Sequence, residues 1–281
     1  MKFLTHSWRS AGIVAVAILG TLGVGGANLS ALALPPEQVR STLAPIPVFT
    51  LTDNEGKPLV ATVPDANNAS ATPDSVAGVF ISQQDANTFL QELRTRNPEV
   101  GNNIQVVPVS LAEVNDLANE SRTQPNPITF TFIPQQRQVE QATTIIRQTN
   151  PQIQEFNGVP LFAARAGQDQ GYLTISVNNQ QVIPFFFERE QLDEMIARFR
   201  QEQPTMAATI QVQVIPLEGV IQTLQTSDNE DLAKIVLWPS REAIQFVQSL
   251  PPDPNPTPGA TPSPQARPTT PNPQAIPATP R

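Results

Sequence analysis

The sequence predicts a mixed α+β fold of two similar lobes, each a small sheet with helices packed on one face. Alternating apolar runs typical of strands occur between stretches in which apolar residues recur at i, i+3, i+4 and i+7, as on one face of a helix. One strand-and-helix unit occurs twice, as VAGVFISQQDANTFLQEL and as VIPFFFEREQLDEMIARF. A single offset aligns Ser82 with Glu188 and Pro98 with Pro204. A matched strand, helix face and terminating proline indicate an internal duplication.

Both ends of the chain differ from this pattern. Residues 1–33 read as a cleavable secretory signal, with a basic start, an apolar run from Ala11 to about Gly26, and Ala31-Leu32-Ala33 as the cleavage site. An uncut membrane anchor is the alternative. Residues 251–281 are rich in proline and have no apolar periodicity, so we expect an extended, disordered tail. We expect the two lobes at 34–150 and 151–250.

The first lobe should contain strands, helices and turns in a fixed order. Ser82 with Asp85, and Ser110 with Glu113, have the spacing of helix N-terminal caps. The first of these helices should end near Asn97, because proline disfavours helical geometry in the residue before it. The expected elements are strands at 46–52, 58–60 and 78–81, a helix to 97, a strand at 104–109, a helix from 110, a strand at 128–133 and a helix at 135–148.

The second lobe repeats this order. Asn178-Asn179 should form a turn between two strands, and Ser240 should cap the last helix, which ends near Leu250. The expected elements are strands at 159–163, 171–177 and 182–187, a helix to 203, a strand at 210–215, a helix through 217–224, a strand at 234–238 and the last helix.

Composition excludes several classes of function. The chain of 281 residues has a formal net charge of −8, no cysteine and a single histidine, His6, which lies in the predicted signal. An acidic chain disfavours nucleic acids and anionic lipid surfaces. Because the chain has no cysteine and no histidine outside the predicted signal, the mature chain offers no Cys or His metal ligand and no Ser-His-Asp or Cys-His catalytic set. It also lacks the GxxxxGK[ST] and GxGxxG nucleotide motifs. We expect no cofactor, no metal and no enzyme activity.

Carboxylates are the one remaining acid-base option. They gather in two clusters. The first comprises Glu188, Glu190, Asp193 and Glu194, and the second comprises Asp228, Glu230 and Asp231. We interpret the first as a helix start, where acids are favoured by the helix dipole, and the second as a solvated loop. A glycan hydrolase with two facing carboxylates is the alternative and ranks last.

Phenylalanine points towards a binding function. Phe185, Phe186 and Phe187 are consecutive, so one strand carries aromatic side chains on both faces. Either this strand is buried on both sides, or one face lines an apolar groove for extended polypeptide segments. The candidate client-binding residues are Phe185, Phe186, Phe187, Phe130, Phe132 and Trp238.

The segments IPVFTLTDNEGKPL, VFISQQDANTFLQELR, VIPFFFEREQLDEMIARF and KIVLWPSREAIQFVQSL resemble the cyanobacterial branch of the Tic twenty-two-like family, over about residues 40–250. In plastids this family is an intermembrane-space component of the envelope import machinery. The resemblance implies a pseudo-twofold α/β structure with apolar pockets and no catalytic residues. It also implies a periplasmic location, with the thylakoid lumen as the alternative, and a part in outer-membrane biogenesis.

Two functional hypotheses follow from the residues and the resemblance together. The first is a chaperone-like binding protein that holds precursor polypeptides, above all outer-membrane proteins, in apolar grooves, with the outer-membrane assembly machinery as a further partner. The second is a non-catalytic scaffold or adaptor for envelope complexes, with the proline-rich tail as a contact. Neither hypothesis includes a nucleic acid or a membrane span after signal cleavage.

Overall fold

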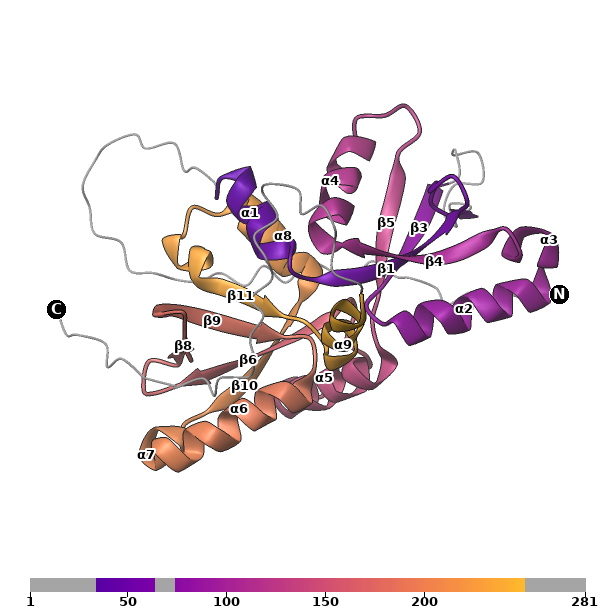
Figure 1. Cartoon of the computed structure of the whole chain (residues 1–281). Coiled ribbons are helices and arrows are strands. Elements are labelled where there is room, and N and C mark those ends of the chain that lie inside the picture. The colour runs from indigo at the N-terminus through magenta and orange to yellow at the C-terminus, as the bar shows by residue number, and fades with distance from the viewer. Residues whose placement is uncertain (1–33, 64–73, 251–281) are drawn as a thin grey trace. The chain divides into compact units, whose positions relative to one another are not determined.

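The computed structural model describes residues 34–63 and 74–250 (Figure 1). The predicted signal, the tail and most of the predicted loop at 64–75 lie outside these ranges. Within them, no helix is long and apolar enough to cross a bilayer.

Two mixed sheets form the framework, which confirms the predicted fold class. The strands of the first, five-stranded sheet are β1 (Pro47–Asp53), β2 (Val60–Val63), β3 (Asp74–Phe80), β4 (Ile104–Ser110) and β5 (Ile128–Ile133). The strands of the second, six-stranded sheet are β6 (Pro160–Ala166), β7 (Gly171–Tyr172), β8 (Ile175–Val177), β9 (Gln180–Phe186), β10 (Gln211–Pro216) and β11 (Ile235–Trp238).

Helices follow the strands in matching order. Those of the first half of the chain are α1 (Pro36–Leu43), α2 (Gln83–Arg96), α3 (Pro98–Gly101), α4 (Leu111–Ser121) and α5 (Gln136–Thr149). Those of the second half are α6 (Arg189–Glu202), α7 (Pro204–Ala207), α8 (Leu217–Thr226), the 3-10 helix η1 (Glu230–Lys234) and α9 (Arg241–Ser249).

The two sheets have the same strand pairing. β1 is antiparallel to β3 and β4, and β3 is parallel to β5. In the same way, β6 is antiparallel to β9 and β10, and β9 is parallel to β11. Even single hydrogen bonds repeat, because the Leu111 amide donates to the Ile46 carbonyl and the Leu217 amide to the Val159 carbonyl, both at 2.8 Å. This equivalence supports the internal duplication that the sequence predicts.

The helix caps and the hairpin turn that the sequence predicts are present. The Ser82 hydroxyl accepts from the Asp85 amide, and the Ser240 hydroxyl accepts from the Ala243 amide. The Ser110 amide donates to the Glu113 carboxylate at 2.8 Å, completing a capping box. Asn178 and Asn179 have φ values of 50° and 64°, as a two-residue hairpin turn requires.

Several features differ from the sequence-based expectation. The short helices α3 and α7, which follow α2 and α6, were not expected, and β2 begins at Val60 rather than at Pro58. Helix α1 is additional: it places Val39 and Leu43 in the core through only two turns, which is too short for a periodic signal. The strand expected at 171–177 is divided, because β7 pairs with β6 whereas β8 pairs with β9. The segment before β11, expected as loop, contains η1.

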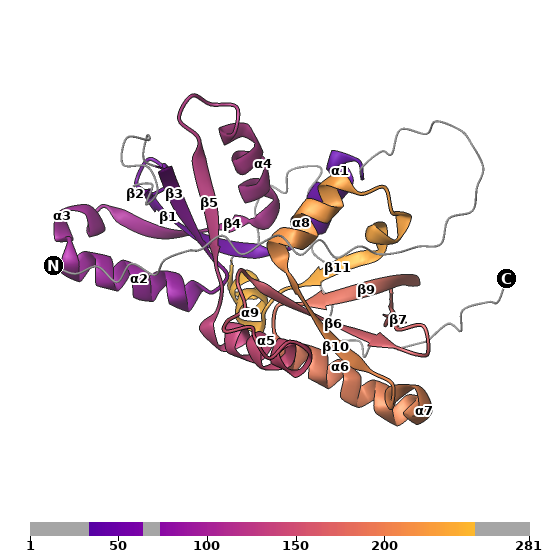
Figure 2. The ribbon, with the colours of Figure 1, turned by 180° about the vertical axis from the view of Figure 1, so that it is seen from behind.

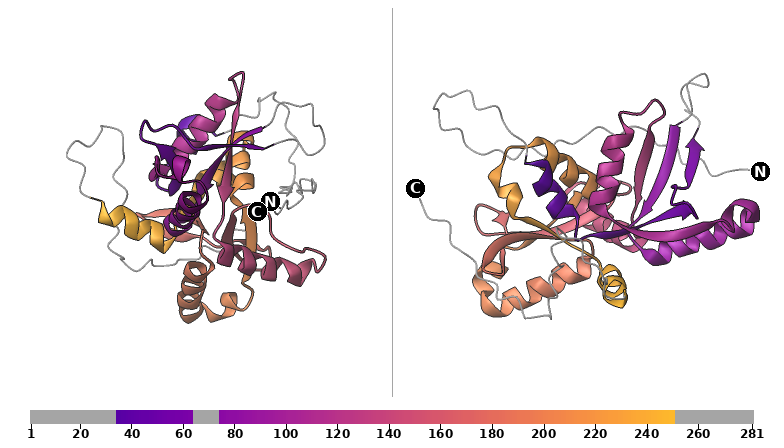
Figure 3. Two further views of the ribbon diagram at one scale, coloured as in Figure 1. Left: turned by 90° about the vertical axis from the view of Figure 1, so that its right-hand side faces the viewer. Right: turned by 45° about the horizontal axis from the view of Figure 1, so that its top comes forward.

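Helices also cover both faces of each sheet, rather than one face as expected. Val48 of β1 packs with Leu111 of α4 in one apolar cluster, whereas the adjacent Phe49 packs with Leu90 of α2 in another. Neighbouring strand residues point to opposite faces, so α4 and α2 lie on opposite sides of the first sheet. Figure 3 shows α4 alongside β5 and α2 apart from it.

The cluster that contains Val48 continues into the second sheet, and we call it the shared core. It includes Val79 and Leu111 from the first half with Leu161, Phe185 and Leu217 from the second. Helix α1 packs against α4 and against α8, and Figures 1 and 2 both show it beside α8. The two sheets are therefore joined by continuous apolar packing.

The last helix of each half packs on the sheet of the other half. Helix α5 follows β5 but packs against β6 and β10, and α9 follows β11 but packs against β1. The Phe49 and Phe246 rings lie 5.2 Å apart, edge to face. The boundary at residue 150 stays a prediction, and these two exchanged helices pack across it.

Candidate functional site

The three consecutive phenylalanines, Phe185 and Phe186 at the end of β9 and Phe187 directly after it, are buried on both faces of the sheet. Phe185 and Phe187 are 3% and 2% exposed and belong to the shared core, whereas Phe186 is 4% exposed and packs under α6. These side chains offer almost no surface to a client in this conformation. Their burial favours the first alternative from the sequence, a strand enclosed on both sides.

The other three candidates are half-buried and lie on different faces. Phe130 and Phe132 pack at the margin of the shared core, on the face of the first sheet that carries Val79. Trp238 packs with Phe186 on the face of the second sheet that points away from the shared core, and the two rings lie 5.8 Å apart. The six predicted residues therefore do not form one surface, and Phe130, Phe132 and Trp238 are the three among them with aromatic surface still accessible.

The counterparts of Phe130 and Phe132 in the second sheet are fully buried. The Ile81 amide donates to the Ile133 carbonyl, and the Phe187 amide donates to the Trp238 carbonyl. This match aligns Phe130 with Ile235 and Phe132 with Leu237, which are 7% and 3% exposed. The same strand positions are thus covered in the second half and partly uncovered in the first.

The acidic cluster at the start of α6 contacts the neighbouring helices α5 and α9. The Arg241 amide, at the start of α9, donates to the Glu188 carboxylate at 3.2 Å. Glu190 accepts from the side-chain amides of Gln138 and Gln141, at 3.0 and 2.8 Å. Glu190 lies in the first turn of α6, as the helix-start interpretation expects, whereas the Glu188 carboxylate caps α9 and makes no side-chain cap on α6.

Burial and charge shift the pKa values of this cluster in opposite directions. The pKa of Glu188 is raised by burial, an effect that Arg241 partly offsets and that the nearby Glu190 and Glu242 increase. Burial also acts on Glu190, but its hydrogen bonds and the Arg137 guanidinium outweigh it and lower the pKa.

Two members of the second acidic cluster, Glu230 and Asp231, lie in the short helix η1 rather than in the expected loop, and Asp228 precedes it. The Asp231 amide donates to the Asn229 side chain at the start of η1, and Lys234 forms an ion pair with Asp231 at 2.7 Å. In the described part of the chain, no group of three or more His, Cys, Asp or Glu side chains could hold a metal ion.

The exchanged helices α5 and α9 each cap the start of a helix that is distant in the sequence. The Gln138 side chain of α5 accepts from the Arg189 amide of α6, and the Glu242 carboxylate of α9 accepts from the Gln84 amide of α2, at 3.0 and 2.8 Å. The partners of the second bond are 158 residues apart. No local sequence pattern indicates such a pair, because capping between residues distant in the sequence depends on tertiary packing.

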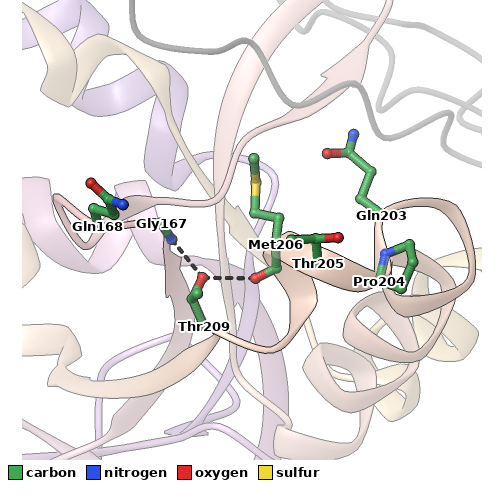
Figure 4. Close-up of a pocket in the computed structure, with 7 residues that line it drawn as sticks. All are labelled: Gly167, Gln168, Gln203, Pro204, Thr205, Met206 and Thr209. Atoms are coloured by element: carbon green, nitrogen blue, oxygen red, sulfur yellow. Dashed lines mark hydrogen bonds between the residues drawn. The ribbon is translucent and has the colours of Figure 1, made fainter.

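A cavity of about 500 Å³ lies between α7 and the turn after β6 (Figure 4). The Thr209 hydroxyl donates to the Met206 carbonyl and accepts from the Gly167 amide, at 2.7 and 2.8 Å. The residues that line it are Gly167, Gln168, Gln203, Pro204, Thr205, Met206 and Thr209. None of the six candidate residues contributes to it.

The fold and these surfaces define a two-sheet α+β protein built from a repeated unit. A model of the Tic22-like family matches residues 6–249, and the chain belongs to this family. The family resemblance inferred from the sequence is therefore confirmed.

Among characterised relatives, the chain is 25% identical over 219 residues to "Protein TIC 22, chloroplastic" of Arabidopsis thaliana, covering 77% of this chain and 73% of the relative. It is 25% identical over 224 residues to the protein of the same name from Pisum sativum, covering 78% and 80%.

Two solved structures share the fold. Anabaena Tic22, described under protein transport, is 30% identical with a TM-score of 0.68, covering 78% of this chain and 98% of that one. Tic22 from Plasmodium falciparum is 20% identical with a TM-score of 0.57, covering 75% and 96%.

Proposed function

We propose that this protein is a non-catalytic binding factor for precursor polypeptides in protein transport. It would act in the periplasm, with the thylakoid lumen as the second location, and hold outer-membrane proteins before their assembly. Membership of the Tic22-like family and the description of Anabaena Tic22 under protein transport support the proposed role in protein transport. The predicted signal supports the compartment.

The observation that carries the binding role is the partly uncovered aromatic pair Phe130 and Phe132. Both side chains sit beside a buried apolar core, and their counterparts in the second sheet are covered. Apolar surface next to a rigid core binds unfolded segments without reading their sequence, because the hydrophobic effect is not directional. Binding of this kind needs no catalytic group or cofactor.

The test is suppression of aggregation. A denatured outer-membrane barrel protein is diluted into buffer with and without a molar excess of the mature chain, and light scattering is followed. We expect reduced scattering with the mature chain and no reduction with an equal mass of serum albumin. Unchanged scattering at every ratio would refute the holding function.

A photo-crosslinking residue at position 130 identifies the surface in cells. Crosslinks to precursor polypeptides would support the role of this face, and crosslinks only to folded envelope proteins would favour the scaffold hypothesis instead.

A further inference from the structure

We propose that β5 is a strand-addition site, at which an extended segment of a precursor polypeptide pairs with the outer edge of the first sheet. The segment alternates apolar and polar residues, as a strand of a membrane barrel does. This inference rests on the proposed function and specifies both the segment that is held and the way in which it is held.

The direction of the peptide groups shows which residues of β5 form this edge. In a strand, the N–H and C=O of one residue point to the same side, and successive residues alternate. The Ile133 carbonyl accepts from the Ile81 amide at 3.1 Å, so Ile133 and Thr131 bond to β3. The peptide groups of Phe130 and Phe132 therefore point away from β3, and we call them the free edge.

Ile128 provides an independent check of this direction. It lies two residues before Phe130, and its amide donates to the Ser121 hydroxyl of α4 at 2.6 Å rather than to β3. Within residues 34–63 and 74–250, β5 pairs with no strand other than β3, and the free edge has no hydrogen-bond partner. A row of unpaired donors and acceptors with this spacing is complementary to an extended polypeptide.

The other end strands of the two sheets are less suited to pairing. β4 contains Pro108, which has no N–H to donate. β11 has four residues, and the Ile235 amide already donates to the Leu232 carbonyl of η1. β10 ends in Pro216, and both α5 and α8 pack against it. In contrast, β5 has six residues and contains no proline and no charged side chain.

The side chains of β5 indicate which sequence the added strand carries. Phe130 and Phe132 lie on the face of the sheet that belongs to the shared core, whereas Thr129 and Thr131 lie on the other face. An added strand continues both faces, so it places apolar side chains beside the phenylalanines and polar side chains beside the threonines. Barrel strands have this alternation, because one of their faces meets lipid and the other meets the polar interior.

Charge and proline content disfavour two other occupants. A second copy of the chain is also acidic, with a formal net charge of −8, so two copies repel each other. The tail at 251–281 has no run of more than three residues without proline, and proline cannot donate to a ladder. A precursor strand meets neither obstacle.

The first experiment compares two fluorescein-labelled peptides of alternating valine and threonine. One is unmodified, and the other is N-methylated at every valine and threonine, which keeps the side chains but removes the N–H donors. The mature chain is titrated into each peptide below the concentration at which the peptide self-associates, and fluorescence anisotropy is recorded. We expect the unmodified peptide to bind about tenfold more tightly. Equal affinity would overturn edge pairing.

Substitutions on two edges test the location. Phe130→Pro removes an outward N–H whereas Phe130→Val keeps it, and both lose the aromatic ring. We expect Phe130→Pro to bind the unmodified peptide about tenfold more weakly than Phe130→Val does. Val214→Pro on β10 is the control and should bind like the parent, because Val214 is the counterpart of Pro108. Equal affinity of the two Phe130 variants, or a larger loss in Val214→Pro, would overturn β5 as the site.

Disulfide trapping provides a readout that does not depend on those variants. The chain has no cysteine, so Thr129→Cys carries a unique thiol. It is oxidised together with peptides that have one cysteine at a threonine position or at a valine position. We expect a disulfide with the first peptide only, because only its cysteine shares a face with Thr129. Lys234→Cys, at the matched position before β11, is the control and should trap neither peptide. Equal yields from the two peptides would overturn the alternating pattern.

Sedimentation velocity of the mature chain tests the second copy as the occupant. We expect a monomer. A dimer that Phe130→Pro dissociates would overturn the precursor strand as the occupant.

These results are separable from a failure of the proposed function. If the chain suppresses aggregation but binds the methylated and unmodified peptides equally, strand addition is wrong and the holding function stands. If the chain neither suppresses aggregation nor binds either peptide, the proposed function itself falls.

Discussion

The burial of each aromatic residue in this protein depends on the residues packed around it and not on the residue type. Phe186 is enclosed by α6 and Trp238, whereas Phe130 lies at the margin of the shared core. The two residues were equivalent candidates in the sequence, because both lie in strands and neither position reveals what covers it.

We therefore expect Phe186→Ala to lower the free energy of unfolding by about 3–5 kcal/mol, because it leaves a cavity in a fully packed region. Phe130→Ala should cost less, because Phe130 is only partly buried and loses less apolar contact. Urea denaturation followed by circular dichroism measures both variants. Equal losses would show that Phe130 is core and not accessible surface.

At the residue scale, the Glu188 carboxyl should make the free energy of unfolding depend on pH. Its folded pKa is raised, chiefly by burial, so the folded state binds this proton more readily than the unfolded state. The unfolding free energy should therefore fall as the pH rises from the ordinary Glu pKa through the raised folded value. Glu188→Gln removes this effect while keeping an oxygen acceptor for the Arg241 amide.

The expected result is that Glu188→Gln gains stability relative to the parent as the pH rises through this interval. Urea denaturation at a series of pH values measures it, with the exposed Glu120→Gln as the control. A constant difference between Glu188→Gln and the parent at all pH values would contradict the assignment.

At the scale of elements, the exchange of α5 and α9 ties each half of the chain to the other sheet. α9 is only nine residues long, and its main anchor is Phe246 against Phe49. A helix of this length is marginal in isolation, so its stability comes from this packing.

We expect Phe246→Ala to lower the free energy of unfolding by about 2–4 kcal/mol, because Phe246 is partly buried and its ring packs against Phe49. Val247→Ala is the matched control on the same helix, since Val247 is 40% exposed, and it should have little effect. Thermal melts of both variants measure the difference. A similar small change in both would mean that α9 is not held by the first sheet.

For the whole molecule, the shared core predicts one cooperative unfolding transition. Val79 of the first sheet is fully buried beside residues of the second sheet, and Trp238 is the only tryptophan in the described part of the chain. Val79→Ala should lower the free energy of unfolding by about 2 kcal/mol. The Trp238 fluorescence transition should shift together with the circular dichroism transition, although the substitution lies in the other sheet. Separate transitions would show that the two halves unfold independently.

Local chemistry made much of the fold predictable. The caps at Ser82, Ser110 and Ser240 and the asparagine turn at 178–179 depend on neighbours a few residues away, so their spacing is visible in the chain. The short helices α1, α3, α7 and η1 were not predictable, because elements of one or two turns carry too few apolar residues to establish a period.

The candidate site was predictable only in part. Phenylalanine enrichment drew attention to β5 and β9, but it could not separate Phe185 and Phe187 in the core from Phe130 at its margin. Exposure depends on which side chains lie above a strand. For Phe130 the helix that packs on its strand is α4, whose position over β5 is decided by the tertiary structure.

The sequence by itself determined the repeated unit, the mixed fold class and the family, because duplication and periodicity are properties of residue order. Only the tertiary structure decided that α5 and α9 cross between sheets and that Phe130 and Phe132 are less buried than their counterparts Ile235 and Leu237. Burial is a sum over neighbours from distant parts of the chain. Two copies with the same pattern can therefore differ in the surface that they leave for a partner.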